Sequence, residues 1–533
     1  MKIIMKNILS SCLVFTLLMV TTQLSIAQAP KNLTLLSSLD FSPQTLAGCW
    51  HYENGGRSYA LLGASEGIII VEVTTADSPE VILQVPGINN LWREVKVEGN
   101  YAFVTTEGID PNGTLNGIQI INLSYLPDSA PSKIYKGDGI IANQLESAHT
   151  ITCAGEFIYI NGHNIVAQGR GVLICNIADP WNPVFVGAIT NNYCHDSYVR
   201  GDTIWTSDIY AGQFSVYNIA DRSNPVLLAT QQTPGNFNHN TWLSDDGQTL
   251  FTTDERGNEP LGSFDVSDLS NISLLDIYYT TNFSTSEVHN VRVLNDFLIN
   301  PSYGSQLTLV DAARPSNLIE IGNYTTGNGL LWDADPYLSS GIIVATEKSP
   351  GTFYVFEPNY QRGCYLEGVI SDSTTGVPIP GATIQILSAG VQKQSKGTGE
   401  YYTGVADPGT FDVLVTKNGY AAKQISGVVL NTGSVTTLDV ELRMLGAGVS
   451  NLNNTLPISL IPNPFTNLII IETDVKPLDM IEMFNVLGEK VLEEKFTSGN
   501  MTCYVNTEEL TSGVYLIRLS SGGQTDFRKL IKN

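Results

Sequence analysis

From residue 32 to residue 358 the chain alternates short apolar runs with polar turns, and no long stretch has the apolar spacing of a helix. Residues 195–231, HDSYVRGDTIWTSDIYAGQFSVYNIADRSNPVLLATQ, contain four such runs: HDSYV, TIWTSD, QFSVYNI and PVLLATQ. Gly, Asn and Asp occupy the turns between them, where a left-handed backbone is often required. The pattern therefore predicts four short antiparallel strands joined by tight turns.

This four-strand unit recurs along the first two-thirds of the chain. Seven copies begin near His51, Arg93, His149, His195, His239, His289 and Asp333. A repeat of four strands every 40–50 residues or so is typical of a β-propeller. The last copy lacks its fourth strand, and NLTLLSSLD (residues 32–40) has the pattern of the missing one. We therefore predict a seven-bladed propeller over residues 28–361, closed by the N-terminal strand; six or eight blades remain open if the first or last copy is misassigned.

The strand pattern changes at Gly363 and again near residue 446. Residues 363–445 and 458–533 each contain alternating strands with Gly and Pro turns, and residues 446–457 form a linker between them. The predicted fold class is thus all-β, a seven-bladed propeller followed by two small β-sandwich domains of Ig-like or prealbumin-like type.

The first 27 residues predict export. Lys2 and Lys6 precede an apolar run, and Ser-Ile-Ala ends at Ala27, which is the arrangement of a secretory signal peptide. A retained membrane anchor is the alternative, but the run is short and contains Ser and Thr. No later segment is apolar enough to span a bilayer. The six cysteines after the signal are scattered, which leaves open one or two disulfides or buried thiols.

The net charge of −24 disfavours nucleic acid and anionic membrane surfaces as partners. Strands such as SVYNI and TLVDA, followed by turns such as ADRSNP, resemble the LVIVD repeat. The order of signal, repeats and C-terminal tail resembles the secreted bacterial choice-of-anchor B proteins. This resemblance implies a fold rather than an activity.

The two C-terminal modules carry their own resemblances. Residues 363–445 resemble the carboxypeptidase regulatory-like domain through Pro380-Gly381-Ala382 and Gly399-Glu400-Tyr401. That resemblance implies a spacer or a binding module. Residues 458–533 resemble the type A C-terminal sorting domain of the type IX secretion system of Bacteroidota, with an unrelated Ig-like module as the alternative. The matching motifs are Pro462-Asn463-Pro464-Phe465, Asn485-Val486-Leu487-Gly488, Ser512-Gly513-Val514-Tyr515 and Lys529-Leu530-Ile531-Lys532.

The sorting-domain resemblance implies handling by the type IX secretion machinery and passage across the outer membrane. The domain is often removed and the protein attached to surface lipopolysaccharide. The expected location is therefore extracellular or on the cell surface.

Five of the six histidines open copies of the repeat. If the first strand of each blade lines the channel, these histidines form a polar ring there, with Arg93, Asp196 and Asp333 as further members besides His51. Imidazoles with nearby carboxylates suit a divalent transition metal. His149, His195, His239 and His289 are the neighbours that could reach one ion. Acidic loops at residues 107–117 and 254–260 could instead hold Ca²⁺.

Two interpretations of the ring stay open. A repeated histidine can simply hydrogen-bond the next blade and seal the ring. The sequence offers no catalytic residue, no cofactor-binding motif and no recognisable nucleophile. We expect an exported binding or adhesion protein with a glycan or surface protein as partner; the alternative is a metal-dependent extracellular lyase or hydrolase with its site at the channel.

Overall fold

A computed structural model describes residues 29–280, 287–304, 306–327, 329–445, 457–473, 476–496 and 501–533. The signal peptide expected at residues 1–27 and residues 446–456 of the expected linker lie outside these ranges. The described residues are almost entirely strands and turns. Their helices are the short 3-10 turns η1 (Gly139–Ile141), η2 (Val166–Gln168), η3 (Ile209–Ala211) and η4 (Leu387–Ala389). Among the residues described, no helix has the length and apolar character needed to cross a membrane.

Seven antiparallel sheets follow one another between Leu33 and Pro358. The first two are β2 (Leu46–Asn54), β3 (Arg57–Ala64), β4 (Gly67–Glu72) and β5 (Glu80–Pro86), then β6 (Arg93–Glu98), β7 (Tyr101–Thr106), β8 (Ile118–Asn122) and β9 (Ser132–Tyr135). The next two are β10 (Thr150–Ala154), β11 (Phe157–Asn161), β12 (Val172–Asn176) and β13 (Val184–Ile189), then β14 (Asp196–Arg200), β15 (Thr203–Asp208), β16 (Gln213–Asn218) and β17 (Val226–Gln232).

The remaining sheets complete the set. The fifth is β18 (Asn238–Leu243), β19 (Thr249–Asp254), β20 (Leu261–Asp265) and β21 (Ser273–Tyr278). The sixth is β22 (Glu287–Val288), β23 (Arg292–Leu294), β24 (Phe297–Tyr303), β25 (Gln306–Asp311) and β26 (Ile319–Thr325). The seventh is β27 (Leu331–Asp335), β28 (Ile343–Glu347), β29 (Thr352–Pro358) and β1 (Leu33–Asp40).

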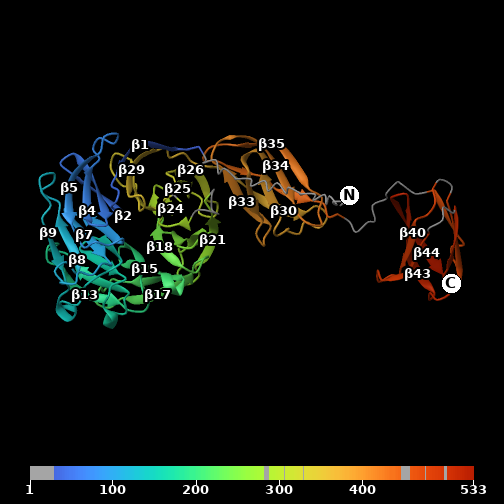
Figure 1. Ribbon diagram of the computed structural model, residues 1–533, viewed down its shortest axis with the longest axis horizontal. Coiled ribbons are helices and arrows are strands. Elements are labelled where there is room, and N and C mark those ends of the chain that lie inside the picture. The colour runs from blue at the N-terminus through green and yellow to red at the C-terminus, as the bar shows by residue number, and fades with distance from the viewer. Residues whose placement is uncertain are drawn as a thin grey trace, which may run out of the picture. The chain divides into compact units, whose positions relative to one another are not determined.

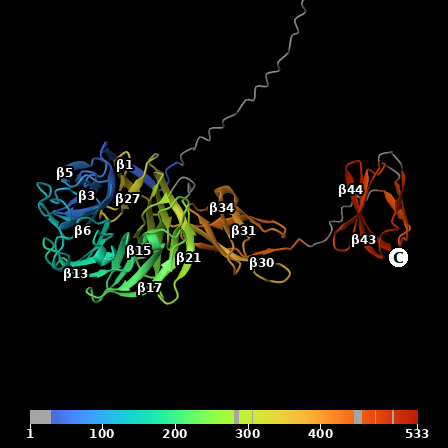
Figure 2. The same ribbon diagram turned by 60° about the horizontal axis from the view of Figure 1, so that its bottom comes forward.

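The sheets form a closed ring. The N-terminal strand β1 pairs with β29, from Leu33 opposite Pro358 to Asp40 opposite Thr352, and Figures 1 and 2 show it beside the last sheet. The first strands contact one another in succession from β2 to β23, β24 contacts β27, and β27 contacts β2 in turn. Because β1 completes the last sheet from the other end of the chain, no sheet is left one strand short. The fold is a β-propeller.

Two kinds of contact hold neighbouring sheets together. Apolar side chains fill the space between them; Phe103 and Ile120 of the second sheet, for example, pack with Ile151 of the third. Threonine hydroxyls at the ends of second strands add hydrogen bonds to the next sheet. Thr105 Oγ1 donates to the carbonyl of His149 at 2.9 Å, and Thr253 Oγ1 donates to that of His289 at 2.8 Å. These bonds fix where each first strand begins, which is where the histidines lie.

A two-sheet sandwich follows the propeller. One sheet is β33 (Glu400–Val405), β30 (Cys364–Asp372), β36 (Val435–Thr437) and β37 (Val440–Leu442). The other is β32 (Val391–Gln394), β31 (Thr383–Ile386), β34 (Gly409–Thr416) and β35 (Lys423–Leu430). Asp311 of the propeller accepts hydrogen bonds from Tyr365 Oη at 2.6 Å and Arg362 Nη1 at 2.7 Å. Propeller and sandwich therefore form one compact unit, which ends at Met444.

The C-terminal residues form a second unit, from Leu445 to Asn533. Its sheets are β38 (Ile458–Ile461), β39 (Leu468–Thr473) and β42 (Thr502–Asn506), and β41 (Lys490–Lys495), β40 (Met480–Phe484), β43 (Gly513–Ser521) and β44 (Gln524–Lys532). Phe465 and Tyr515 of the sequence motifs lie in its core. Asn485 Oδ1 accepts the backbone N–H groups of Leu487 and Glu489 at 3.0 Å, which explains the Asn-Val-Leu-Gly turn.

Candidate metal centre in the propeller channel

The four histidines that the sequence nominates as metal ligands lie in one row across four consecutive sheets. Ring centroids are 4.1 Å apart for His149 and His195, 4.1 Å for His195 and His239, and 4.2 Å for His239 and His289. Three of them are almost fully buried, with 8, 4 and 1 % of His195, His239 and His289 exposed. We call these four residues together with Glu255 the histidine chamber.

Hydrogen bonds to the next sheet orient two of the rings. His195 Nδ1 bonds the carbonyl of His239 at 3.0 Å, and His289 Nδ1 bonds that of Trp332 at 2.6 Å. A carbonyl oxygen only accepts, so Nδ1 carries the proton in both rings. Nε2 of both rings therefore keeps its lone pair. These are the hydrogen bonds between neighbouring blades that the sequence allowed as one of two interpretations. They leave Nε2 of each ring available to a ligand.

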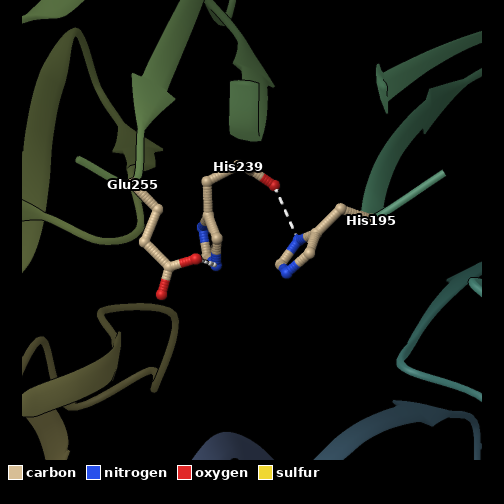
Figure 3. A group of neighbouring side chains, drawn as sticks. All are labelled: His195, His239 and Glu255. Atoms are coloured by element: carbon tan, nitrogen blue, oxygen red, sulfur yellow. Dashed lines mark hydrogen bonds and ion pairs between the residues drawn. The ribbon is translucent and has the colours of Figure 1, made fainter. Parts of the chain in front are cut away.

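Glu255, which follows β19, brings a carboxylate to these nitrogens. Its Oε1 lies 3.7 Å from His289 Nε2, and its Oε2 lies 3.8 Å from His239 Nε2. Figure 3 shows the carboxylate beside the His239 ring, with the His195 ring close by. One ligand atom from each of His195, His239 and Glu255 lies within 4.8 Å of the others. Tyr303 Oη donates to Glu255 Oε1 at 3.1 Å.

The buried imidazoles are neutral near pH 7. Burial lowers the pKa of His195, His239 and His289 well below the usual value, and the neighbouring histidines lower it further. Burial also raises the pKa of Glu255. Neutral imidazole is the form that binds metal ions. The side chain of Glu255 is 25 % exposed, so the chamber is reached from solvent beside it.

The other carboxylates near this end of the channel have different partners. Asp254 Oδ1 and Oδ2 accept hydrogen bonds from Phe237 N at 2.7 Å and Gly235 N at 2.9 Å, which fixes a loop. Glu107 Oε1 lies 2.7 Å from His149 Nδ1, and this hydrogen bond lowers the pKa of Glu107. Glu107 therefore orients the fourth histidine, as carboxylates do beside metal-binding imidazoles.

His51 lies away from this row. The pairing of β18 with β19 shifts register between Asn238 and Asn240, and His239 lies at that shift. The pairing of β2 with β3 has an equivalent shift between Leu46 and Cys49, so Ala47 occupies the position that corresponds to His239. His51 stands four residues further along its strand, and its Nδ1 is 2.8 Å from Asp335 Oδ2. The alignment of His51 with the other four is thus corrected, because β2 runs past the expected ring position before reaching its hairpin turn.

Arg93 stands at the ring position of the second sheet but faces backbone carbonyls. Its Nε donates to Ala64 O at 2.9 Å and its Nη2 bonds Ile88 O, and burial lowers its pKa to about 10. Asp333 and Asp196 lie one residue past the ring position. Asp333 Oδ1 is 2.8 Å from Arg292 Nη2, and Asp196 Oδ2 accepts from Asn240 Nδ2 at 2.6 Å. Neither carboxylate joins the histidines.

A second cavity lies further along the same strands. The cavity beside the histidines measures about 20 Å³ and is also lined by Trp92, Arg93 and Glu94. The other cavity measures about 250 Å³. Its walls include Trp50, Tyr198, Trp242, Arg292 and Tyr337, which we call the aromatic chamber. This chamber was not predicted from the sequence, although Tyr198, Trp242 and Arg292 each follow a ring histidine by three residues.

Family comparisons account for three parts of the chain. Residues 289–326 match the LVIVD repeat, residues 365–443 the carboxypeptidase regulatory-like domain, and residues 459–533 the secretion system C-terminal sorting domain. These matches confirm the three predicted resemblances. The sorting domain indicates that the protein is secreted or displayed at the cell surface.

No curated protein matches the chain in sequence. Among solved structures, the Cps50 (Swd1) β-propeller domain of Myceliophteria thermophila is 9 % identical over 61 % of this chain and 100 % of its own, with a TM-score of 0.45. A candidate 6-phosphogluconolactonase of Bacteroides fragilis is 11 % identical over 68 % of this chain and 95 % of its own, also with a TM-score of 0.45. Likeness at this level carries no argument about function.

Proposed function

We propose that the chain is an exported binding protein whose propeller holds a divalent transition-metal ion between His195, His239, His289 and Glu255. The observation that carries this proposal is a set of acceptors that face one another. His289 Nε2 is buried, has no hydrogen-bond partner among the described residues, and lies 3.7 Å from a carboxylate oxygen. An unprotonated nitrogen and a carboxylate oxygen at this distance repel each other unless a cation or a proton lies between them.

A metal ion can bind this group of imidazole nitrogens and carboxylate oxygens more completely than a proton can. One proton can join Glu255 to a single imidazole, whereas ligand atoms of His195, His239 and Glu255 all lie within 4.8 Å of one another. His289 Nε2 lies 3.7 Å from the same carboxylate. Imidazole nitrogens with one carboxylate form a ligand set suited to zinc and similar ions. At bond lengths of ~2.1 Å, tetrahedral ligand atoms lie roughly 3.4 Å apart. The ligand atoms of His195, His239 and Glu255 are up to 4.8 Å apart. The partly exposed Glu255 side chain can move toward the imidazoles and shorten these distances.

The bound ion would give the channel mouth a positive centre within an acidic protein. Such a centre attracts ligands that carry oxygen donors, and we propose a surface polymer or protein as that ligand. Metal-dependent hydrolysis or elimination is the second candidate. One observation favours it: Glu255 combines a raised pKa with a hydrogen bond from Tyr303, so the pair could transfer a proton beside the ion.

Metal analysis of the purified full-length protein tests the proposal. We expect about one zinc-type ion per chain, and added Zn²⁺ at a hundredfold excess over its Kd should stabilise the propeller by about 2.7 kcal/mol. His289→Ala and Glu255→Gln should lose the ion. The matched control is His51→Ala, which removes a channel histidine outside the chamber and should keep it.

Absence of bound metal, together with a melting temperature that Zn²⁺ does not change, would overturn the proposal. Equal metal loss in His51→Ala and His289→Ala would do the same, because it would indicate general damage to the channel.

We further propose that the sorting domain directs outer-membrane attachment. Deleting residues 459–533 should retain the protein in the periplasm, because these residues carry the match to the secretion system C-terminal sorting domain. Fractionation and surface immunolabelling of the expressing cells measure this. The control deletes residues 365–443, the regulatory-like domain; surface display that survives the C-terminal deletion would contradict the assignment.

A further inference from the structure

The aromatic chamber has a different chemistry from the histidine chamber. The Trp242 and Tyr337 ring centroids lie 6.0 Å apart with an interplanar angle of 17°, and those of Tyr198 and Trp242 lie 4.8 Å apart. The side chain of His51 is 27 % exposed at the edge of the cavity, so the cavity reaches solvent there. At about 250 Å³ it is slightly smaller than pockets for drug-sized ligands, which begin at roughly 300 Å³. It has room for a ligand of one ring.

A cationic ligand does not suit this chamber. Aromatic walls can form a cage for an ammonium group. Here the protein supplies its own cations: the Arg292 guanidinium lies 4.9 Å from the centre of the Trp242 ring, and Lys96 Nζ lies 4.4 Å from that of Trp50. These two side chains already take the place of a ligand cation beside the rings.

An anionic ligand does not suit it either. Arg292 is paired with Asp333 at 2.8 Å, and Lys96 is paired with Glu94. His51 faces Asp335 at 2.8 Å. Every cation that lines the chamber therefore already has a carboxylate, and the Asp196 carboxylate adds a further negative charge at the wall. An incoming anion would have to displace one of these buried pairs, which is costly.

Polar groups in the walls also exclude a purely apolar ligand. Arg292 Nε is buried without a hydrogen-bond partner among the described residues. The hydroxyls of Thr152 and Ser197 line the same cavity but already donate to Ser197 O and Asn161 Oδ1. A hydrocarbon would leave the Arg292 Nε donor unpaired at a cost of roughly 1–3 kcal/mol. The fitting ligand is neutral, has an apolar face to lie against aromatic rings, and has oxygen atoms at its edge.

We propose that the aromatic chamber binds a single neutral sugar ring, either free or at the end of a glycan. A pyranose has C–H faces that pack on Trp50 or Trp242, and it has hydroxyl oxygens that accept from Arg292 Nε. This assignment deepens the proposed binding role and rests on it, but the sugar site is independent of the metal. The layer of Glu94, Lys96, Arg292 and Asp333 lies between the two chambers along the strands.

The test uses full-length protein treated with a chelator, so that its outcome is separate from that of the metal experiment. The probes are the methyl glycosides of glucose, galactose and N-acetylglucosamine, with methyl glucuronide and choline as charged contrasts. Binding is followed by tryptophan emission and by calorimetry. We expect saturable binding of at least one neutral glycoside and none of the charged probes.

Trp242→Leu should weaken glycoside binding at least tenfold. The matched control is Trp181→Leu, because Trp181 packs against Tyr101 with ring centroids 5.9 Å apart and does not line the chamber. Tyr198→Leu serves if the Trp242 variant does not fold.

Three results would overturn the proposal: no neutral glycoside binding up to the solubility limit, preferential binding of glucuronide or choline, or equal effects of the Trp242 and Trp181 substitutions. None of these results depends on whether the metal is bound.

Discussion

The two chambers of the channel are made by the same strands and differ in almost every property. His195, which directly precedes β14, and His239 of β18 belong to one chamber, and Tyr198 and Trp242 line the other, three residues further on. The cavity beside the four histidines, which Glu255 does not line, measures about 20 Å³ and has room for an ion or a water molecule. The aromatic chamber measures about 250 Å³ and has room for a small ring.

The layer of ion pairs between the two chambers is a separate structural element. Glu94, Lys96, Arg292 and Asp333 are all at least nine-tenths buried and form two ion pairs. Buried pairs of this kind cost much to dehydrate and are worth little net stability, yet removing one partner is strongly destabilising. The layer therefore separates the chambers only while it stays intact.

Removing one partner from this layer should have the largest effect. Asp333→Ala leaves the Arg292 guanidinium buried without its carboxylate, and we expect a loss of roughly 3–5 kcal/mol in the free energy of unfolding. Urea denaturation followed by tryptophan emission measures this. Glu72→Gln is the control, because its partner Arg57 is half exposed and little change is expected. Similar losses in the two variants would contradict the structural role of the layer.

The second largest effect should be the dependence of stability on pH, which differs between the two chambers. The pKa values of His195, His239 and His289 are lowered below the ordinary value of 6.5, so the unfolded chain binds more protons below that pH. Stability of the chelator-treated protein should therefore fall as pH drops below about 6.5. His195→Asn should remove one such group and reduce that loss by about 1.4 kcal/mol per pH unit.

For His51 the sign is opposite. Burial lowers its pKa, but the Asp335 and Glu53 carboxylates together raise it by more, and the net shift is upward. Its contribution is present at low pH and is lost as pH rises through the folded pKa. As pH falls, the His51→Asn variant should therefore lose stability as steeply as the wild type or more steeply. Unfolding midpoints at pH 6.5 and 5.5 measure both effects, and a His195 variant as acid-sensitive as the wild type would contradict the assignment.

A single hydrogen bond in the aromatic chamber should have the smallest effect. Tyr337 Oη donates to the carbonyl of Val293 at 3.0 Å, and Tyr337→Phe removes this bond while keeping the ring. We expect a loss of about 0.5–1.5 kcal/mol in the free energy of unfolding, with sugar and metal binding unchanged. Thermal unfolding with and without the probes measures this. A loss of metal in this variant would indicate that the chambers are coupled.

Sequence alone predicted part of the candidate site well. The positions of His149, His195, His239 and His289 followed from the repeat, because a repeated strand pattern places equivalent residues at equivalent points of the ring. His51 was misplaced because the first hairpin is longer than the others. It stands four residues before Gly55, whereas His149 and His195 stand six residues before Gly155 and Gly201. That difference in spacing was a signal in the sequence.

Glu255 was not singled out among the acidic residues. It follows Asp254 at the end of a second strand, and the two neighbouring carboxylates have the same chemistry. Only the folded chain shows that Asp254 turns to the backbone of its own loop, while Glu255 turns to His239 and His289. The aromatic chamber was missed for a related reason: its walls combine residues from several sheets.

The sequence by itself determined the order of the modules, the four-strand repeat, the closing strand and the row of histidines. These features depend on local strand period and turn chemistry, which neighbouring residues specify. The tertiary structure alone decided which carboxylate faces the histidines, where the ion pairs divide the channel, and which rings line its wider part. These depend on ring closure and on register shifts, because a shift of one residue turns a side chain to the other face of its strand.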